Sequence, residues 1–207
     1  VDGVLGNNLV RILLDRGYDV KVLIEKGKQA KYLQDLPVEK CTGSILDYEG
    51  LAAEMKSFDI VIHAPAKTDT WPPRHESYYR VNVEGTKNII KAVTENKIKR
   101  LLHIGTANSF GPGSKEQPGN EKNEFAGAKY KLDYITSKYE AQKEVLRAVE
   151  EDGLDAVVLN PTFMIGPYDS KPSSGQMIMA VNEGKVPGYP PGGRNFVYVK
   201  DVANAIA

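Results

Sequence analysis

Two Tyr-x-x-x-Lys pairs fall within one stretch of helical periodicity, at about residues 132–151: Tyr134 with Lys138, and Tyr139 with Lys143. A free tyrosine hydroxyl titrates near a pH of about 10. A neighbouring ammonium group stabilises the phenolate and lowers the pKa, which suits the hydroxyl to proton transfer at neutral pH. Residues four apart share one helix face, so either pair could act as an acid–base unit. The pattern alone does not choose between them.

The two faces of this helix differ in polarity, and this difference favours the first pair. The stripe that contains Tyr134 and Lys138 is otherwise apolar and continues through Ala141, Val145 and Ala148. We therefore predict that Tyr134 and Lys138 point inward. The stripe with Tyr139, Lys143 and Arg147 is polar, and we expect it to face water. An inward lysine is costly unless its ammonium has a function. The alternative is a packed tyrosine beside a lysine that extends its ammonium to the solvent.

Gly3 and Gly6 precede a helical pattern at residues 7–16. They fit the last two glycines of a dinucleotide-binding turn, where glycine lets the backbone approach a pyrophosphate and the helix N-terminus adds positive potential. The first glycine of such a turn would lie just before Val1. Two glycines fit a purely structural turn equally well.

Glu25 follows Gly6 by 19 residues and ends the predicted strand Asp19–Ile24. An acidic residue at this place binds the ribose diol of NAD, so the spacing favours NAD over NADP. Lys26 and Lys28 stand beside it, and either could instead meet the 2′-phosphate of NADP. A solvated strand end is the alternative without a ligand.

Apolar, β-branched runs alternate with helical periodicity along the chain, which predicts βαβ units and an α/β fold with a parallel, doubly wound sheet. The predicted strands are Asp19–Ile24, Cys41–Ile45, Asp59–Ala64, Lys99–Gly105, Leu154–Asn160 and Asn195–Val199. The predicted helices are at about 7–16, 28–35, 48–57, 74–96, 132–151, 175–183 and 201–207.

Glycine, proline and polar residues mark the helix ends and the loops between these predicted elements. Gly17 and Gly153 stand where a glycine would end a helix. Segments rich in glycine, proline or polar residues at 111–127, 168–175 and 186–194 are predicted loops. The first two leave the carboxyl ends of strands, where ligands bind in open parallel sheets, and are therefore candidate substrate walls.

Four motifs occur in a characteristic order: Gly3-Val4-Leu5-Gly6, Asn82-Val83-Glu84-Gly85-Thr86, Tyr134-Ile135-Thr136-Ser137-Lys138 and Asn160-Pro161. With them the chain resembles, over almost its whole length, the extended short-chain dehydrogenase/reductases of the NAD-dependent epimerase/dehydratase group. Through Pro187–Ala203 it also resembles bacterial dihydroflavonol-reductase-like proteins. The resemblance implies a Rossmann domain, here residues 1–160, and a smaller substrate-binding part that starts in 161–207 and interleaves with the last Rossmann elements.

The resemblance also implies site residues. Thr106 aligns with the family's serine or threonine that hydrogen-bonds the reacting oxygen, and it completes a catalytic set with Tyr134 and Lys138. Without the alignment, Thr106 would be an ordinary strand-end hydroxyl. The implied cofactor-binding residues are Gly3, Leu5, Gly6, Glu25, Lys26, Ser44, Ile45, His63, Ala64, Asn82, Tyr134, Lys138, Asn160 and Pro161.

These residues predict hydride transfer between NAD or NADP and a secondary alcohol or its ketone, with Tyr134 moving the hydroxyl proton. Two departures from the family pattern bear on the reaction. Ala107 and Asn108 replace the Asp-Glu that dehydratases use, which disfavours dehydration. Gly105 stands where many relatives carry a hydroxyl, and we expect it to widen the site slightly. Nucleotide-sugar epimerisation remains an alternative, as does a cofactor-sensing binding protein on the same fold.

Composition limits the partners. Lysine plus arginine equals aspartate plus glutamate, at 27 each, so no basic excess favours nucleic acid or an anionic membrane. We expect a small-molecule substrate, and a homodimer stays open. Cys41 is the single cysteine, and no apolar run approaches the roughly 20 residues of a membrane span. We expect a cytoplasmic protein.

Three further expectations concern individual groups and the chain ends. No metal site is predicted, since the three histidines, His63, His75 and His103, form no ligand pattern with Cys41 or the acids. The aromatic residues Trp71, Tyr78 and Tyr79 could line a substrate pocket or serve packing. The chain starts in a glycine turn without a methionine and stops inside a helical pattern. We therefore expect a missing first strand and a missing C-terminal part, and poor stability and cofactor binding for a polypeptide that begins at Val1.

Overall fold

The computed structural model describes residues 3–69, 71–170, 174–188 and 191–207. Val1 and parts of the predicted loops 168–175 and 186–194 lie outside the described residues. The chain divides into two compact units. Unit 1 comprises residues 1–42 and 161–207, and unit 2 comprises residues 43–160. The predicted domains 1–160 and 161–207 follow function rather than contacts, and that division stays a prediction.

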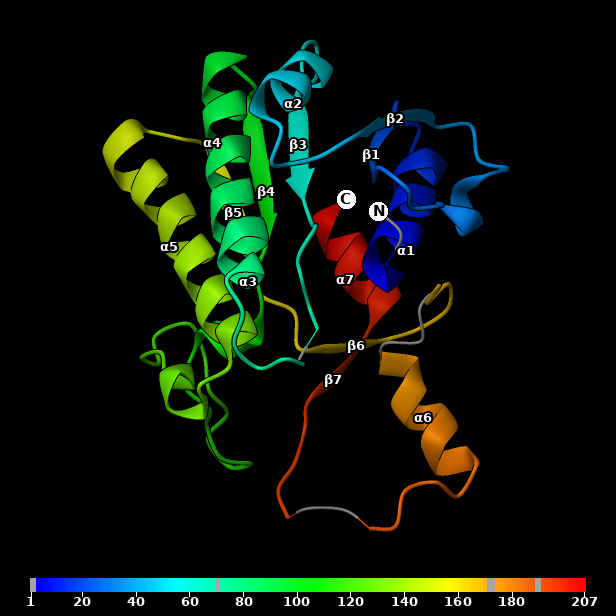
Figure 1. The fold of residues 1–207 in the computed structure, drawn as a ribbon, viewed down its shortest axis with the longest axis vertical. Coiled ribbons are helices and arrows are strands. Elements are labelled where there is room, and N and C mark those ends of the chain that lie inside the picture. The colour runs from blue at the N-terminus through cyan, green and yellow to red at the C-terminus, as the bar shows by residue number, and fades with distance from the viewer. Residues whose placement is uncertain (1–2, 70, 171–173, 189–190) are drawn as a thin grey trace. The chain divides into compact units, whose positions relative to one another are not determined.

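Unit 2 is built on a parallel three-stranded sheet in the order β3-β4-β5, shown in Figure 1. Its strands are β3 (Ile60–His63), β4 (Arg100–Ile104) and β5 (Ala156–Leu159). Its helical elements are α2 (Tyr48–Glu54), α3 (Ser77–Tyr79), η2 (Arg80–Glu84), α4 (Gly85–Glu95), η3 (Ala107–Ser109), η4 (Gly127–Tyr130) and α5 (Asp133–Asp152). In this sheet His63 pairs with His103, and Ile104 pairs with Leu159. All three strands therefore end at one edge.

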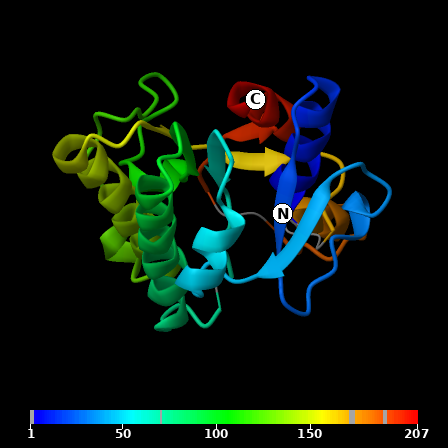
Figure 2. The ribbon, with the colours of Figure 1, turned by 90° about the horizontal axis from the view of Figure 1, so that it is seen from above.

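Helices α4 and α5 pack against each other and against this sheet on one side, as Figure 2 shows from above. Val93, Leu101 and Val145, from these helices and the central strand, are fully buried. On other positions of the sheet, Ile60 is 47% exposed and Val157 is 43% exposed. The prediction that helices cover both faces therefore does not hold evenly in unit 2. Apolar residues indicate a strand, but they do not tell which element covers each face.

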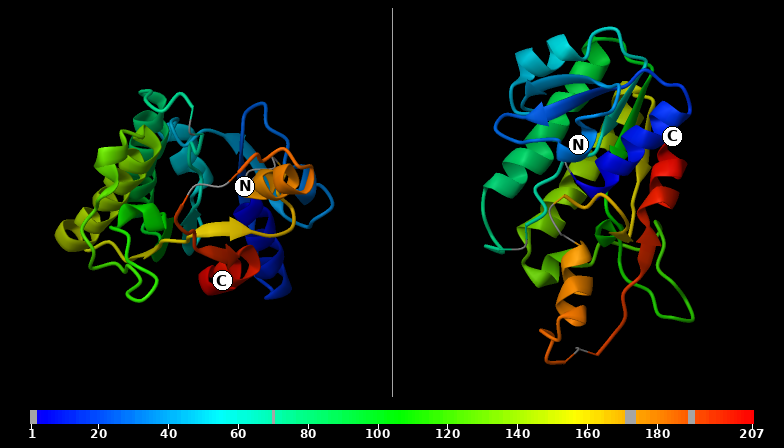
Figure 3. Two further views of the ribbon diagram at one scale, coloured as in Figure 1. Left: turned by 90° about the horizontal axis from the view of Figure 1, so that it is seen from below. Right: turned by 90° about the vertical axis from the view of Figure 1, so that its right-hand side faces the viewer.

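Unit 1 contains two sheets of two strands each, β1-β2 and β6-β7, the second of them parallel. Its elements are α1 (Val4–Asp15), β1 (Lys21–Glu25), η1 (Lys31–Leu33), β2 (Glu39–Gly43, whose last residue falls in unit 2), β6 (Phe163–Ile165), α6 (Ser174–Asn182), β7 (Phe196–Tyr198) and α7 (Val199–Ile206). Helices α1 and α7 lie side by side (Figure 3). A small core of Val10, Val22, Ala30 and Leu33 joins α1 to the strand and turn that follow.

The predicted succession of elements is largely present, with three differences. The predicted helix 28–35 is wrong, because only a short 3-10 turn forms at Lys31–Leu33. β6 at Phe163–Ile165 was not predicted, since three residues after Pro161 give too short a run to recognise. The strands form three separate sheets in the described residues instead of one. Hydrophobic periodicity finds strands but carries no information on which strands share hydrogen bonds.

The predicted glycine stops are present. Gly153 caps α5 at a φ of 68°, and Gly17 follows α1 at a φ of 80°, both in the left-handed region that glycine adopts without strain.

No helix in the described part of the chain is long and apolar enough to cross a membrane.

Candidate active site

Catalytic and cofactor-binding residues proposed from the sequence gather at the carboxyl edge of the sheet in unit 2. Thr106 follows β4, Asn160 follows β5, and His63 ends β3. The N-terminal half of α5, which carries Tyr134 and Lys138, packs beside η3. Because the three strands are parallel, their ends bring residues that are distant in sequence to one place.

The inner stripe of α5 is buried as predicted. Ala141 and Val145 have no exposed surface, and Lys138 is only 4% exposed. On the outer stripe, the side chains of Lys143 and Arg147 are more than half exposed and pair with neighbouring glutamates. The helical period thus separates the two lysines as the sequence indicates.

Tyr139 departs from the expectation that it faces water. Its ring is partly buried and stacks on Phe125, with ring centroids 4.0 Å apart and planes 9° apart. Phe125 belongs to the long segment between η3 and η4, so its position depends on tertiary structure. Tyr139 therefore anchors that segment to the helix.

Lys138 is an ammonium group inside unit 2. Its Nζ donates a hydrogen bond of 2.7 Å to the backbone carbonyl of Ile104, at the end of β4. Burial lowers the pKa of Lys138 from 10.5 to about 8, because the interior solvates the charged form poorly. One carbonyl satisfies one of three N–H groups, so the remaining N–H groups are suited to further oxygen acceptors.

The Tyr134 hydroxyl lies near enough to the side chain of Thr106 for Thr106 to affect its pKa, which brings two of the proposed catalytic residues together. Burial raises the pKa of Tyr134 above its usual value of 10, and Thr106 opposes this shift. The sequence had suggested that Lys138 lowers this pKa. In the structure burial is the largest influence on the pKa of Tyr134, and its direction is upward.

Thr106 is held in place from two sides. Its backbone N–H donates to Oδ1 of Asn160 over 2.8 Å, and its Oγ1 accepts from the backbone N–H of Asn108 over 3.3 Å. The same Asn160 oxygen lies 2.0 Å from where a Cβ of Gly105 would stand. The expectation that Gly105 widens the site is therefore wrong, because the Asn160 side chain fills the space that glycine leaves.

Asn82 makes hydrogen bonds to Lys67 and to Ser137, three residues after Tyr134. Its Oδ1 accepts from the backbone N–H of Lys67 over 2.8 Å, and its Nδ2 donates to the carbonyl of Lys67 and to Oγ of Ser137. Ser137 in turn donates to the Tyr134 carbonyl over 3.0 Å. Asn82 lies in the π-helical turn η2, a form that often marks functional sites.

Four further residues of unit 2 are predicted to bind the cofactor: Ser44, Ile45, His63 and Ala64. Neighbouring residues hold them in place. Ile45 packs so closely on Gly85 that a Cβ there would lie 2.5 Å from Ile45 Cδ1. Ser44 Oγ accepts from the Leu46 backbone N–H. His63 is buried and its Nε2 lies 2.9 Å from Thr86 Oγ1. Ala64 follows His63 at the end of β3 and is partly buried.

Burial holds both inner histidines neutral. The pKa of His63 falls from 6.5 to about 3, mainly through burial and secondarily through the charge of Lys138. His103, beside it in the sheet, is also fully buried, and burial again lowers its pKa well below 6.5. Within the described residues, no group of three or more His, Cys, Asp or Glu is placed to hold a metal ion.

Unit 1 carries the other predicted cofactor residues: Gly3, Leu5, Gly6, Glu25, Lys26 and Pro161. Gly3 is the N-cap of α1 and has no side chain to cap it, and Gly6 lies inside the helix with Leu5 buried beside it. Glu25 ends β1 and is exposed, as is Lys26. A bare helix N-terminus and an exposed carboxylate fit a phosphate and a ribose diol, respectively.

Several supporting residues were not predicted. In unit 1, Asn7 and Asn8 are buried, and their Nδ2 atoms donate to the carbonyls of Tyr168 and Pro167. Two adjacent asparagines at the start of an apolar helix were a signal in the sequence. In unit 2, Ser137 and Thr86 are buried and hydrogen-bonded, and His103 is buried nearby, but their types and spacing gave no sign of this.

Of the three aromatic residues considered for a substrate pocket, Tyr78 serves packing. Tyr78 is fully buried, and its hydroxyl donates to the carbonyls of Asp69 and Pro72. Trp71 is 82% exposed, and Tyr79 is 36% exposed.

A model of the NAD dependent epimerase/dehydratase family matches residues 1–207. The chain belongs to this family. The resemblance inferred from the motifs is therefore confirmed, together with an α/β fold of the Rossmann type with parallel strands.

Individual members of the family are similar to this chain. A protein of Synechocystis sp. that carries the provisional name dihydroflavonol 4-reductase is 33% identical over 202 residues, covering 97% of this chain and 58% of the relative. A 4-hydroxy-2-methyl-3-oxo-4-farnesyl-3,4-dihydroquinoline-1-oxide ketoreductase of Stigmatella aurantiaca is 30% identical over 173 residues, covering 81% of this chain and 49% of the relative. The crystal structure of the protein gox2253 is similar with a TM-score of 0.92 at 32% identity, covering 99% of this chain and 62% of that chain. This chain thus spans about half to three fifths of these proteins.

Proposed function

We propose that the full-length protein reduces a ketone to a secondary alcohol with NADH or NADPH. The observation that carries this proposal is the place of Tyr134 on the inner face of α5 near Thr106, where burial raises the pKa of its hydroxyl. A group that donates a proton to a forming alkoxide must hold that proton at working pH. A protonated Tyr134 can therefore serve as the general acid that carbonyl reduction requires.

The residues fit a nicotinamide cofactor. The partly satisfied ammonium of Lys138 suits ribose hydroxyls, and exposed Glu25 at the end of β1 suits the second ribose. When bound, the cofactor supplies the hydride. Tyr134 then donates its proton to the carbonyl oxygen, and Thr106 orients that oxygen by a hydrogen bond. Lys138 stabilises the phenolate that Tyr134 leaves behind.

The relatives support a carbonyl substrate, since one is named a ketoreductase and another provisionally a dihydroflavonol reductase. Ala107 and Asn108 offer neither of the carboxyl groups that a dehydratase would use. The test is turnover by the full-length protein of a panel of ketones and nucleotide sugars with either cofactor. We expect one cofactor oxidised per ketone reduced. Product without net cofactor consumption would instead show an epimerase, and cofactor binding without turnover a sensing protein.

For cofactor choice we propose NAD, which agrees with the family description. Glu25→Ala should weaken NAD more than NADP, because the ribose diol loses its acceptor. Dissociation constants of wild type and variant for both cofactors measure this. A strong preference of the wild type for NADP would instead assign the site to Lys26 or Lys28 and a 2′-phosphate.

A further inference from the structure

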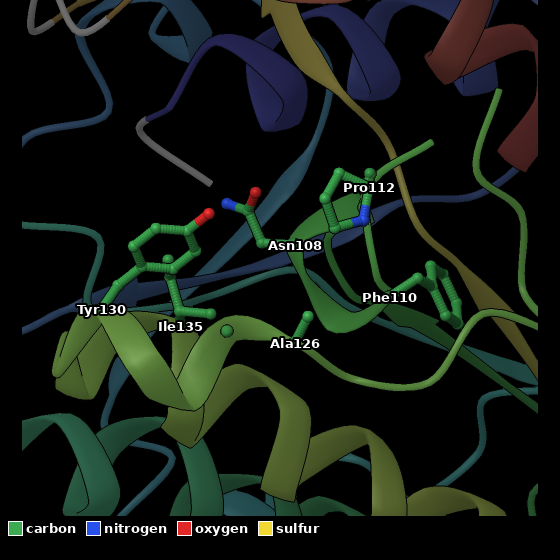
Figure 4. A pocket seen from close by; sticks show the side chains of 8 residues that line it. Asn108, Phe110, Pro112, Ala126, Tyr130 and Ile135 are labelled. Atoms are coloured by element: carbon green, nitrogen blue, oxygen red, sulfur yellow. The ribbon is translucent and has the colours of Figure 1, made fainter. Parts of the chain in front are cut away.

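A cavity of about 150 Å³ lies in unit 2 beside the proposed catalytic residues, shown in Figure 4. Its wall is formed by Ala107, Asn108, Phe110, Pro112, Ala126, Gly127, Tyr130 and Ile135. Ala107 and Asn108 directly follow Thr106 in the chain, and Ile135 directly follows Tyr134. The cavity wall therefore includes the next residue in the chain after each of the two residues that would hold the carbonyl oxygen.

The wall is apolar except at one edge. No lysine, arginine, aspartate or glutamate belongs to it, so a charged group inside would find no partner. The amide of Asn108 and the hydroxyl of Tyr130 point toward one another across the cavity in Figure 4. Asn108 is also fixed by its backbone, which donates to Thr106 Oγ1. The edge thus offers polar contacts next to Thr106.

The volume restricts the occupant. An apolar cavity of about 150 Å³ is large enough for one benzene molecule. A sugar ring of similar size would direct hydroxyls at Phe110, Pro112 and Ile135, whose side chains cannot hydrogen-bond them. Each unsatisfied hydroxyl lowers affinity, whereas an apolar ring gains from leaving water.

We infer that this cavity binds an uncharged, phenyl-sized apolar substituent of the ketone, with Asn108 and Tyr130 contacting a polar atom at its rim. The inference rests on the proposed function and narrows it. The substrate class is aryl or branched alkyl ketones, and Ala126 and Tyr130 are specificity-determining residues.

Two matched variants of the full-length protein test the apolar part. Ala126→Leu fills the cavity, whereas Ala128→Leu adds the same side chain at an exposed position two residues later. The measurement is the ratio of kcat/KM for acetophenone to kcat/KM for acetone. We expect a wild-type preference for acetophenone that falls at least about tenfold in Ala126→Leu and stays unchanged in Ala128→Leu. No preference in the wild type, or equal loss in both variants, would overturn the inference.

A binding measurement separates this inference from the proposed function. Titration calorimetry with 1-phenylethanol and oxidised cofactor should show binding by the wild type and Ala128→Leu and loss in Ala126→Leu. Such binding without turnover of any ketone would leave the cavity assignment standing and reject the reductase. Turnover of ketones without selective loss of binding in Ala126→Leu would do the reverse.

The polar edge has its own test. Tyr130→Phe removes one hydroxyl and leaves the ring in place. We expect the hydroxyacetophenones to lose several-fold in kcat/KM relative to acetophenone in this variant. An unchanged ratio for every ring position would overturn the role of Tyr130.

Discussion

Helix α5 carries the same Tyr-x-x-x-Lys sequence twice, and the two copies have opposite environments. Lys138 is 4% exposed and bonded to a backbone carbonyl, whereas the Lys143 side chain is 54% exposed and pairs with Glu140. Tyr134 reaches Thr106 at the sheet edge, and Tyr139 stacks on Phe125. Five residues do not make a whole number of helical turns, so the two copies of the motif lie on different faces of the helix. One copy faces the sheet and the other faces the surface.

The difference teaches that chemistry follows from surroundings rather than from the motif. Burial lowers the pKa of Lys138 to about 8, whereas the hydrogen bond with Glu140 raises the pKa of Lys143. A functional Tyr–Lys pair needs a tyrosine hydroxyl at the site where the substrate reacts. It also needs a lysine whose charge no carboxylate neutralises. Only the inner pair meets both conditions.

The sharpest way to break this comparison is to remove each tyrosine hydroxyl in the full-length protein. Tyr134→Phe should lower kcat by at least about two orders of magnitude, the usual contribution of a positioned general acid. Tyr139→Phe should keep the stack on Phe125 and leave kcat unchanged. Steady-state kinetics, with cofactor Kd as the folding control, measure both. Equal losses would contradict the assignment of the inner face.

The two lysines give the next effect. Lys138→Met should lower kcat at least about tenfold, because the phenolate loses its cation, while Lys143→Met changes little. The variant also tests burial of the charge. Since the folded pKa of about 8 lies below 10.5, the unfolded chain holds more protons between these values, and wild-type stability gains about 1.4 kcal/mol per pH unit there.

Urea unfolding of wild type and Lys138→Met at pH 7.5 and 9.5 measures this gain. The part of the increase in unfolding free energy with pH that is due to Lys138 should be absent from Lys138→Met. A difference between the two proteins that stays constant with pH would show that the ammonium is solvated after all.

The histidines extend the comparison to acid. The folded pKa of His63, about 3, lies below 6.5, so the unfolded chain binds protons first as the pH falls from 6.5 toward 3. Stability is lost through this window, by about 1.4 kcal/mol per pH unit for this one group. His63→Asn should reduce the slope of unfolding free energy against pH. His75→Asn, at an exposed ring, is the matched control. Equal slopes in all three proteins would place His63 in contact with water.

The smallest effect is expected on the outer stripe. Arg147 pairs with Glu144 and Glu151 at the surface, where water and salt screen the charges. Arg147→Gln should leave both kcat and the urea midpoint within the scatter of repeated wild-type measurements. A clear loss of stability would mean that the ion pairs of the outer face act as a network.

The sequence predicted much of the candidate site because helical period and polarity are local properties. It separated Lys138 from Lys143, placed Glu25 at a strand end, and identified the family from four short motifs. It did not reveal the hydrogen bonds of Asn82 to Lys67 and Ser137, or the stack of Tyr139 on Phe125. These contacts join segments far apart in the chain, and their residue types also occur at ordinary surface positions.

The sequence by itself therefore determined most of the order of strands and helices, the inward face of α5 and membership of the family, since each depends on residues close together along the chain. Tertiary structure alone decided which strands pair, and it set the direction of the Tyr134 pKa by burying the hydroxyl beside Thr106. It also decided that Asn160 fills the space above Gly105. Burial and close packing are sums over neighbours that the chain brings together only on folding, so no local pattern contains them.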